Sequence, residues 1–136
     1  AVCHFGTYKI AGVALPLFTL FGADALEFRL KNSGATTLVT DANNLPKVLE
    51  ILDELPDLKT ILCIDGAIET AFDFHTLLGQ ASDKFETITT GQNDPALLVY
   101  TSGTTGPPKG ALHGHRVLIG HLPCVETAYN FFPKKL

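Results

Sequence analysis

The sequence predicts an α/β fold, with a mostly parallel sheet that is covered by helices on both faces. Short apolar and β-branched runs alternate along the chain with helical segments, which is the pattern of βαβ units. The run at residues 59–64 shows little alternation of polar and apolar side chains, as expected of a strand buried on both faces. Right-handed crossovers between neighbouring parallel strands are then expected.

The expected elements are short and follow one another closely. Helical segments are recognised by apolar residues three or four positions apart, and strands by short apolar runs between turn residues. In order, we expect a helix over residues 1–11, a strand over 13–18, a helix over 23–32, a strand over 36–40, a helix from Asn43 or Asn44 to residue 52, a strand over 59–64, a helix over 72–78, a loop over 80–94, a strand over 96–100, a short strand around 111–112 and a helix over 115–129.

Glycine and proline mark the limits of the first elements. Gly12 suits the left-handed position that follows a helix. Pro16 lacks a backbone donor, so its strand is expected at a sheet edge or to end early. Leu26 and Leu30 stand four apart, which is amphipathic helix spacing, and Gly34 ends that helix.

Asparagine and proline delimit the later helices. Asn43 or Asn44 can cap the third helix through its side chain, and Pro46 then falls in the first turn, where proline is tolerated. Pro56 ends this segment. In the last helix, Pro123 removes a backbone donor, so we expect a break or a kink there.

The composition predicts one domain with some of its apolar surface covered. The 136 residues are about the size of one domain, and a 46% apolar content can fill a core. Charged residues make up 18% of the sequence, below the roughly 25% usual in soluble domains. We therefore expect part of the surface to be covered by the rest of a larger protein. Neither end has a clear opening or closing element, which favours a fragment.

Charge and hydropathy exclude several classes of function. The net charge of −4 and the absence of a basic stripe argue against nucleic-acid binding. Apolar runs are far shorter than the ~20 residues that span a bilayer, and no secretory signal is visible. Cys3, Cys63 and Cys124 are odd in number and widely spaced, so we expect three reduced cysteines and a cytoplasmic location.

The residues that point to a function form a glycine- and threonine-rich loop after the strand expected at residues 96–100. In an open α/β sheet, ligands bind at the carboxyl ends of the strands. Glycines let the backbone approach a ligand closely, successive N–H groups can hold an anion, and a lysine adds a point charge suited to phosphate. The loop therefore predicts a polyphosphate site made of Thr101, Ser102, Gly103, Thr104, Thr105, Gly106, Lys109 and Gly110.

This loop does not fit the two most familiar nucleotide-binding patterns. The P-loop requires a second glycine five residues after the first, but five residues after Gly103 stands Pro108. Lys109 is followed by Gly110, where a P-loop has serine or threonine. No Gly-x-Gly-x-x-Gly occurs, so a dinucleotide fingerprint is excluded as well.

Residues 101–110 resemble the motif Ser/Thr-Ser/Thr/Gly-Gly-Ser/Thr-Thr-Gly-x-Pro-Lys-Gly of the acyl-adenylate-forming (AMP-binding) superfamily. That superfamily includes acyl-CoA synthetases, peptide-synthetase adenylation domains and firefly-type luciferases. Residues 12–17 and 35–41 are similar to two strands of the same family. The stretches after the loop resemble the acetyl- or medium-chain acyl-CoA synthetase branch most, in residues 112–116, 121–123 and 131–133.

The resemblance implies a reaction and its participants. A small carboxylic acid attacks ATP in the presence of Mg²⁺, acyl-AMP and pyrophosphate form, and CoA then displaces AMP. Residues 101–110 would hold the β- and γ-phosphates, with hydroxyl donors from Ser102, Thr104 and Thr105 and backbone donors near Gly103 and Gly106. Lys109 would lie beside the phosphates as the catalytic residue of this segment.

The family's other active-site segments have no counterpart in this sequence. We therefore expect residues 1–136 to be a single partial domain, a fragment of the family's large N-terminal domain without its C-terminal lid domain. The remainder of the same polypeptide would then be its partner, and the 136 residues alone are expected to be inactive. Two alternatives stay open: an adenylation domain that loads a carrier protein, and a non-catalytic nucleotide- or phosphate-binding module.

Histidines give a weaker signal. His113 and His115 are two apart and would share one face of a strand, but no third ligand stands nearby in the sequence. We therefore expect no metal site. By resemblance, His113 is a candidate to lie behind the residues that contact the substrate.

Overall fold

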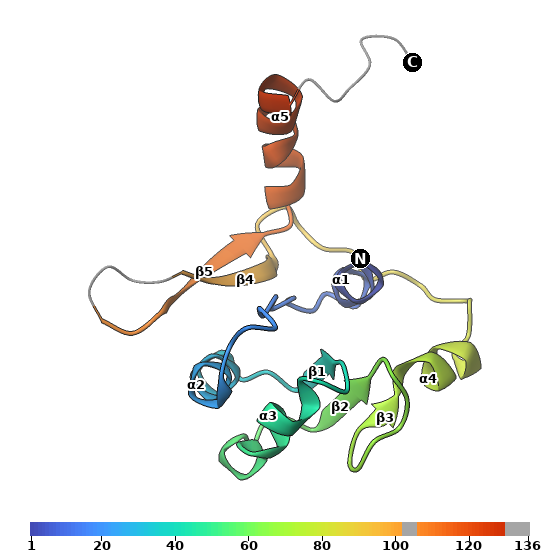
Figure 1. The fold of residues 1–136 in the computed structure, drawn as a ribbon. Helices are drawn as coiled ribbons and strands as arrows, with labels where there is room; N and C mark the ends of the chain where they lie inside the picture. The colour runs from blue at the N-terminus through green and yellow to red at the C-terminus, as the bar shows by residue number, and fades with distance from the viewer. Residues whose placement is uncertain (102–105, 130–136) are drawn as a thin grey trace. The chain divides into compact units, whose positions relative to one another are not determined.

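The computed structural model describes residues 1–101 and 106–129 (Figure 1). Contacts within the chain divide it into two compact units. One comprises Ala1–Ala14 with Thr87–Leu136, and the other comprises Leu15–Glu86. Helices and strands alternate along the chain, which confirms the α/β class.

The unit formed by Leu15–Glu86 is built on a parallel sheet. Its strand order is β1-β2-β3, and both neighbouring pairs are parallel, as the alternating pattern predicts. The elements are α2 (Ala23–Ser33), β1 (Thr37–Thr40), α3 (Leu45–Leu49), the 3₁₀ helix η1 (Leu52–Glu54), β2 (Thr60–Cys63), β3 (Phe72–Asp73) and α4 (Phe74–Gln80).

The core of this unit is formed mainly by α2, α3, β2 and the residues on either side of η1. In β2, Ile61 and Cys63 are buried while Thr60 and Leu62 are half-buried, so one face of the strand points into the core. The helices fill the space above that face, and α4 contributes no buried residue. The buried apolar cluster consists of Leu26, Leu30, Leu45, Val48, Ile51, Leu55, Leu58, Ile61, Cys63 and Ala71.

Two helix predictions in this unit need correction. The third helix does not continue to residue 52, because α3 ends at Leu49 and the chain tightens into η1. The helix expected from residue 72 begins two residues later, since Phe72 and Asp73 pair with β2 as a strand. The Asp73 carboxylate accepts a hydrogen bond from the Thr76 backbone N–H, which caps the first turn of α4.

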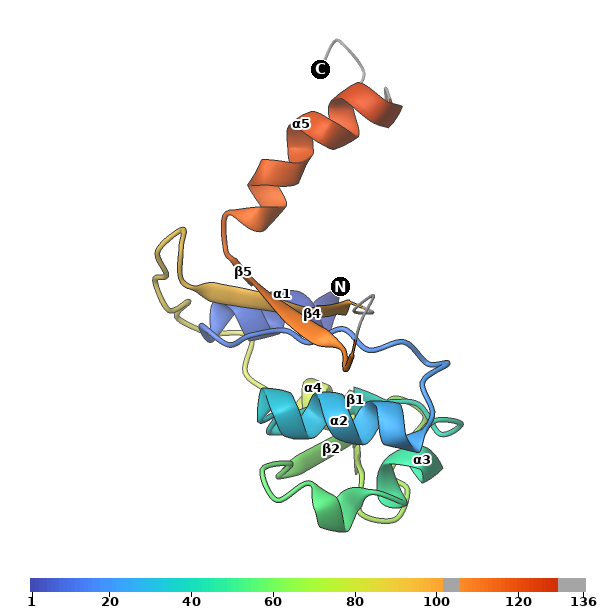
Figure 2. The ribbon, with the colours of Figure 1, turned by 90° about the vertical axis from the view of Figure 1, so that its left-hand side faces the viewer.

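The other unit is built on an antiparallel hairpin (Figure 2). Its elements are α1 (Val2–Lys9), β4 (Pro95–Thr101), β5 (Lys109–Gly114) and α5 (Val117–Tyr129). The strand expected over residues 13–18 is reduced to one parallel bridge, in which Ala14 pairs with Leu97. Two backbone hydrogen bonds form this bridge: the Ala14 N–H donates to the Ala96 carbonyl at 2.8 Å, and the Leu98 N–H donates to the Ala14 carbonyl at 2.9 Å.

The end of α1 shows why Gly12 is not the left-handed residue. Ala11 takes that conformation, with φ of 56°. The Ala11 N–H donates to the Tyr8 carbonyl at 3.1 Å, and the Gly12 N–H donates to the Thr7 carbonyl at 2.8 Å. These two bonds form a Schellman motif with alanine at its left-handed position and glycine one residue later. Gly12 instead permits close approach, because a Cβ there would lie 3.0 Å from Thr7 Cγ2.

The last helix begins later than expected and continues through its proline. The N–H groups of His115 and Arg116 donate to the carbonyls of Asp94 and Gln92, both at 3.1 Å, so they belong to a turn against residues 91–94. Pro123 lies inside α5 without ending it. Within the described residues, no helix is both long enough and apolar enough to cross a membrane. Ile119 of α5 is 72% exposed, so this helix carries apolar surface, as the low charge content of the sequence led us to expect.

Gly114→Ala is expected to lower the free energy of unfolding by about 1–3 kcal/mol, because an added Cβ would overpack this turn. The Cβ would lie 2.8 Å from the Gln92 carbonyl oxygen and 3.1 Å from Asn93 Cα, both of them backbone atoms. Gly120→Ala is the matched control, since a Cβ at this helical position meets no atom within 4 Å. The control should be neutral or stabilise the helix by about 0.5–1 kcal/mol in urea unfolding. Equal midpoints for both variants would contradict the packing argument.

Candidate functional site

The predicted phosphate-binding loop connects the two strands of the β4–β5 hairpin. Thr101 at the end of β4 pairs with Lys109 at the start of β5. The Thr101 hydroxyl lies 3.5 Å from the Lys109 carbonyl oxygen, which is a long hydrogen bond. The loop therefore leaves and re-enters the sheet at a single pair of residues, as a closed hairpin loop.

The pleat of the hairpin places Thr101 and Lys109 on the same face. Residues directly opposite each other in an antiparallel pair share a face, and faces alternate along each strand. The Val99–Ala111 and Leu97–His113 pairs lie on the face of Thr101 and Lys109. The two side chains predicted to flank the phosphates thus point to one side of the sheet.

Lys109 and Thr101 are both exposed. Within residues 1–101 and 106–129, Lys109 makes no salt bridge. An exposed ammonium group without a carboxylate partner can meet a phosphate at little desolvation cost. The structure therefore leaves this charge available at the base of the loop.

Of the other predicted loop residues, the structure describes Gly106 and Gly110. Gly106 has φ of 102°, a conformation that residues with a side chain rarely adopt. Gly110 pairs with Tyr100 on the face opposite Lys109. The predicted hydroxyl and backbone donors at Ser102, Gly103, Thr104 and Thr105 lie outside the described residues.

The two histidines after the loop are separated by the structure. His113 lies in β5, on the face of Lys109, whereas His115 follows the end of the strand. The His115 ring contacts the Tyr8 ring edge to face, with centroids 5.8 Å apart. Among the described residues, no three His, Cys, Asp or Glu side chains come together as metal ligands.

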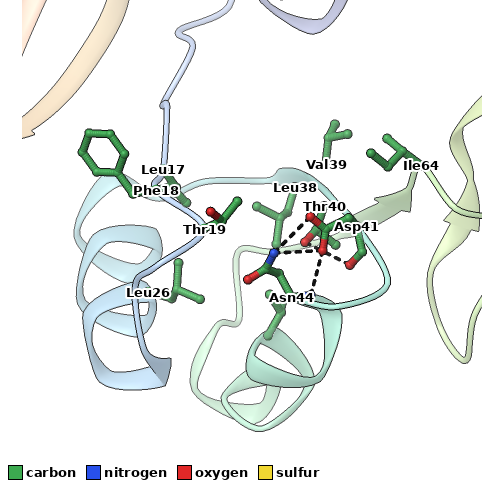
Figure 3. A pocket seen from close by; sticks show the side chains of 11 residues that line it. Leu17, Phe18, Thr19, Leu26, Leu38, Val39, Thr40, Asp41, Asn44 and Ile64 are labelled. Carbon is green, nitrogen blue, oxygen red and sulfur yellow. Dashed lines mark hydrogen bonds between the residues drawn. The ribbon is translucent and has the colours of Figure 1, made fainter.

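A small pocket lies in the unit formed by Leu15–Glu86, at the carboxyl ends of β1 and β2 (Figure 3). Its volume is about 210 Å³, smaller than the roughly 300–1,000 Å³ of pockets that hold drug-sized ligands. The apolar part of its wall includes Leu17, Leu26, Leu38 and Val48. Its polar edge includes Asp41 and Asn44.

The Asp41 carboxylate is engaged by the chain itself. Asp41 Oδ1 accepts hydrogen bonds from the Asn44 backbone N–H and from Asn44 Nδ2, both at 2.8 Å (Figure 3). Lys47 Nζ then donates to Asn44 Oδ1 at 2.8 Å and to the Thr19 carbonyl at 2.9 Å. The Asn44 backbone N–H, and after it the Asn44 side-chain amide, hold the pKa of Asp41 below its ordinary value.

This network corrects the predicted helix cap. Neither Asn43 nor Asn44 caps α3 with its side chain. Asp41 instead forms the turn ahead of α3: its carboxylate accepts the Asn44 N–H, and its backbone carbonyl accepts the Leu45 N–H at 3.0 Å. Sequence reasoning could have found this turn, since an aspartate side chain often accepts a hydrogen bond from the backbone a few residues on. The polar edge of the pocket thus begins a helix, and we assign it no ligand.

The sequence model described as "AMP-binding enzyme" matches residues 1–132 of this chain. Acetyl-coenzyme A synthetase of Bacillus subtilis (strain 168) is 36% identical over 119 residues, covering 84% of this chain and 20% of that protein. Benzoate–CoA ligase of Thauera aromatica is 32% identical over 114 residues, covering 84% of this chain and 21% of that protein. The chain therefore spans about a fifth of the length of these curated relatives.

Solved structures show the same likeness. The anthranilate CoA ligase AuaEII, crystallised with anthranoyl-AMP, superposes with a TM-score of 0.81 at 28% identity. The match covers 93% of this chain and 24% of that protein. The resemblance drawn from residues 101–110 is confirmed at the level of the family and of the fold.

Asp41→Asn is expected to reduce the acid sensitivity of folding. Because the pKa of Asp41 is lowered in the folded state, its contribution to stability is present above the ordinary pKa of 3.8. It is lost as the pH falls through the lower pKa of the folded state. Unfolding midpoints measured from pH 7 to pH 2 should fall less steeply below pH 4 in Asp41→Asn than in the parent.

Asp53→Asn is the control for this experiment. Asp53 is an exposed carboxylate of η1 that accepts no hydrogen bond from the described part of the chain. Its curve should run parallel to that of the parent protein. A parallel curve for Asp41→Asn as well would show that the network does not stabilise the folded state.

Proposed function

This chain belongs to the AMP-binding enzyme family, and we propose that it serves the ATP-dependent activation of a carboxylic acid. In this reaction the carboxylate attacks the α-phosphorus of ATP, the bond from that phosphorus to the bridging oxygen breaks, and acyl-AMP and pyrophosphate form. The thiol of CoA then attacks the acyl carbon, its proton is lost, and AMP leaves. The observation that carries the proposal is the β4–β5 hairpin, which closes the motif of residues 101–110 at Thr101 and Lys109.

The chemical demand of the first step is a stabilised leaving group. Pyrophosphate leaves with increasing negative charge, and preorganised donors directed at that charge lower the barrier. We propose that Lys109 and the Thr101 hydroxyl supply two such groups from one face of the hairpin. Gly106 has a positive φ of 102°, which glycine adopts without strain shortly before the start of β5.

The remaining loop donors complete the proposed site. By resemblance, Ser102, Thr104 and Thr105 donate hydroxyl hydrogen bonds to the β- and γ-phosphates, and the backbone at Gly103 and Gly110 approaches them closely. Mg²⁺ enters this proposal bound to the phosphates of ATP, as part of the substrate. Lys109 is the one cation that the described residues place at the base of this loop.

CoA is the acceptor that the relatives favour over a carrier protein. The two curated relatives described above are named as a CoA synthetase and a CoA ligase. Their acids, acetate and benzoate, differ in size and shape, so the proposal extends to a carboxylic acid without naming one. We further propose that residues 1–136 form part of one large domain, to which the rest of the polypeptide adds the other substrate contacts.

A cytoplasmic location belongs to the same proposal. Cys3, Cys63 and Cys124 are all free in the structure. Free cysteines, one of them exposed, are typical of proteins kept in a reducing compartment.

Thr104→Ala and Lys109→Ala are each expected to slow ATP–pyrophosphate exchange by about one to three orders of magnitude, because single donors to a developing charge contribute about that much. The measurement uses the protein made from the full reading frame that encodes this sequence. Lys84→Ala is the matched control, since Lys84 is exposed and lies outside the hairpin. Unchanged exchange in both loop variants, with the control also unchanged, would remove the loop from the mechanism.

A further inference from the structure

Tyr100 and Gly110 form the cross-strand pair next to the base of the loop. They are directly opposite each other in the antiparallel register, one residue before the Thr101–Lys109 pair. A Cβ built on Gly110 would lie 3.4 Å from both Cε1 and Cζ of the Tyr100 ring. The ring therefore lies in close van der Waals contact with the position of a side chain at residue 110.

Leu98 takes part in the same contact. Its Cδ1 atom lies 3.0 Å from the position of a Gly110 Cβ, so it also packs against the glycine. Leu98 and Tyr100 are two apart in β4 and share one face of the hairpin. Gly110 is thus covered by two side chains of the opposite strand, of which the tyrosine is nearer to the loop.

This face of the hairpin is not the face that carries the phosphate-binding side chains. Thr101 follows Tyr100 in β4, and Lys109 precedes Gly110 in β5. Because side chains alternate between faces along a strand, Thr101 and Lys109 point to the other side of the hairpin. Tyr100 consequently supports the two strand ends from behind, without occupying the space in front of Lys109.

A glycine in a strand weakens local pairing, because it has more backbone freedom and no side chain to pack. An aromatic residue opposite a strand glycine compensates by covering it, and cross-strand pairs on one face stabilise the register. At Gly110 this compensation acts on the residue bonded to Lys109. The contact between the Tyr100 ring and Gly110 is thus one residue from the Thr101–Lys109 pair on both strands.

We propose that Tyr100 is a positioning residue for ATP, whose ring, seated on Gly110, fixes the two strand ends that present the phosphate-binding loop. The proposal rests on the proposed function of residues 101–110. It assigns Tyr100 no contact with the nucleotide, and it assigns the effect to the ring rather than to the hydroxyl group. The strand ends at Thr101 and Lys109 would then present their side chains to the phosphates from a fixed separation.

The consequence is selective for one substrate. Displacing catalytic or binding groups by about 1 Å can cost roughly a hundredfold in rate. Tyr100→Ala should raise KM for MgATP by about tenfold or more. KM for the carboxylic acid should stay within about twofold, because the acid is not held by the loop base.

The test compares three variants of the protein made from the full reading frame. Tyr100→Ala removes the ring, Tyr100→Phe keeps the ring and removes only the hydroxyl group, and Leu112→Ala is the matched control. Leu112 pairs with Leu98 on the same face of the hairpin, and its side chain is 59% exposed. ATP–pyrophosphate exchange gives KM for MgATP and for the acid, and thermal unfolding gives Tm for each variant.

The proposal predicts that KM for MgATP stays within about twofold of the parent value in Tyr100→Phe. In Leu112→Ala it should not change. The proposal is overturned if Tyr100→Phe is as impaired as Tyr100→Ala, which would make the hydroxyl group responsible. It is equally overturned if Tyr100→Ala lowers Tm while both KM values stay at parent levels, or if both rise together. A purely structural role would give those results.

Lys109→Ala in the same assay separates the two levels of the argument. If Lys109→Ala slows exchange and Tyr100→Ala does not, the proposed function stands and the positioning role is wrong. If the parent protein shows no exchange, or Lys109→Ala has no effect, the proposed function fails and the role of Tyr100 fails with it.

Discussion

The antiparallel register of β4 and β5 is the constraint on which the proposed site depends. It pairs Thr101 with Lys109, so that a seven-residue connection is closed at one point and two polar side chains share one face. A shift of one residue would turn Lys109 to the other face. At the far end of the hairpin, the backbone of Gln92 and Asn93 lies against Gly114 with no room for a side chain.

In the parallel unit, two carboxylates bind the backbone where the strands end. Asp41 begins the turn into α3, and Asp65, just after β2, accepts the Ala42 N–H at 2.8 Å. Asp65 thereby joins the ends of β1 and β2. The backbone N–H groups of Ala42 and Asn44, which follow β1, both donate to carboxylates.

Much of the fold could be predicted from the sequence, and the exceptions have identifiable causes. Leu26, Leu30 and Gly34 defined α2 well, because periodicity and a glycine stop act locally. Gly12 was the expected left-handed residue after α1, but the structure has Ala11 in that conformation, with Gly12 one residue later. The strand at Phe72–Asp73 was missed because two residues gain strand character only from their neighbour β2. For the site, spacing identified the loop, whereas the ring of Tyr100 over Gly110 depends on register.

The central claim is that this protein activates a carboxylate with ATP, and ATP–pyrophosphate exchange tests it most directly. The protein from the full reading frame would be assayed with a panel of acids from acetate to long-chain fatty acids, with aromatic acids included. Exchange that depends on MgATP and on one class of acid is the predicted result. A folded protein that binds ATP but catalyses no exchange with any acid would contradict the claim and leave a nucleotide-binding module.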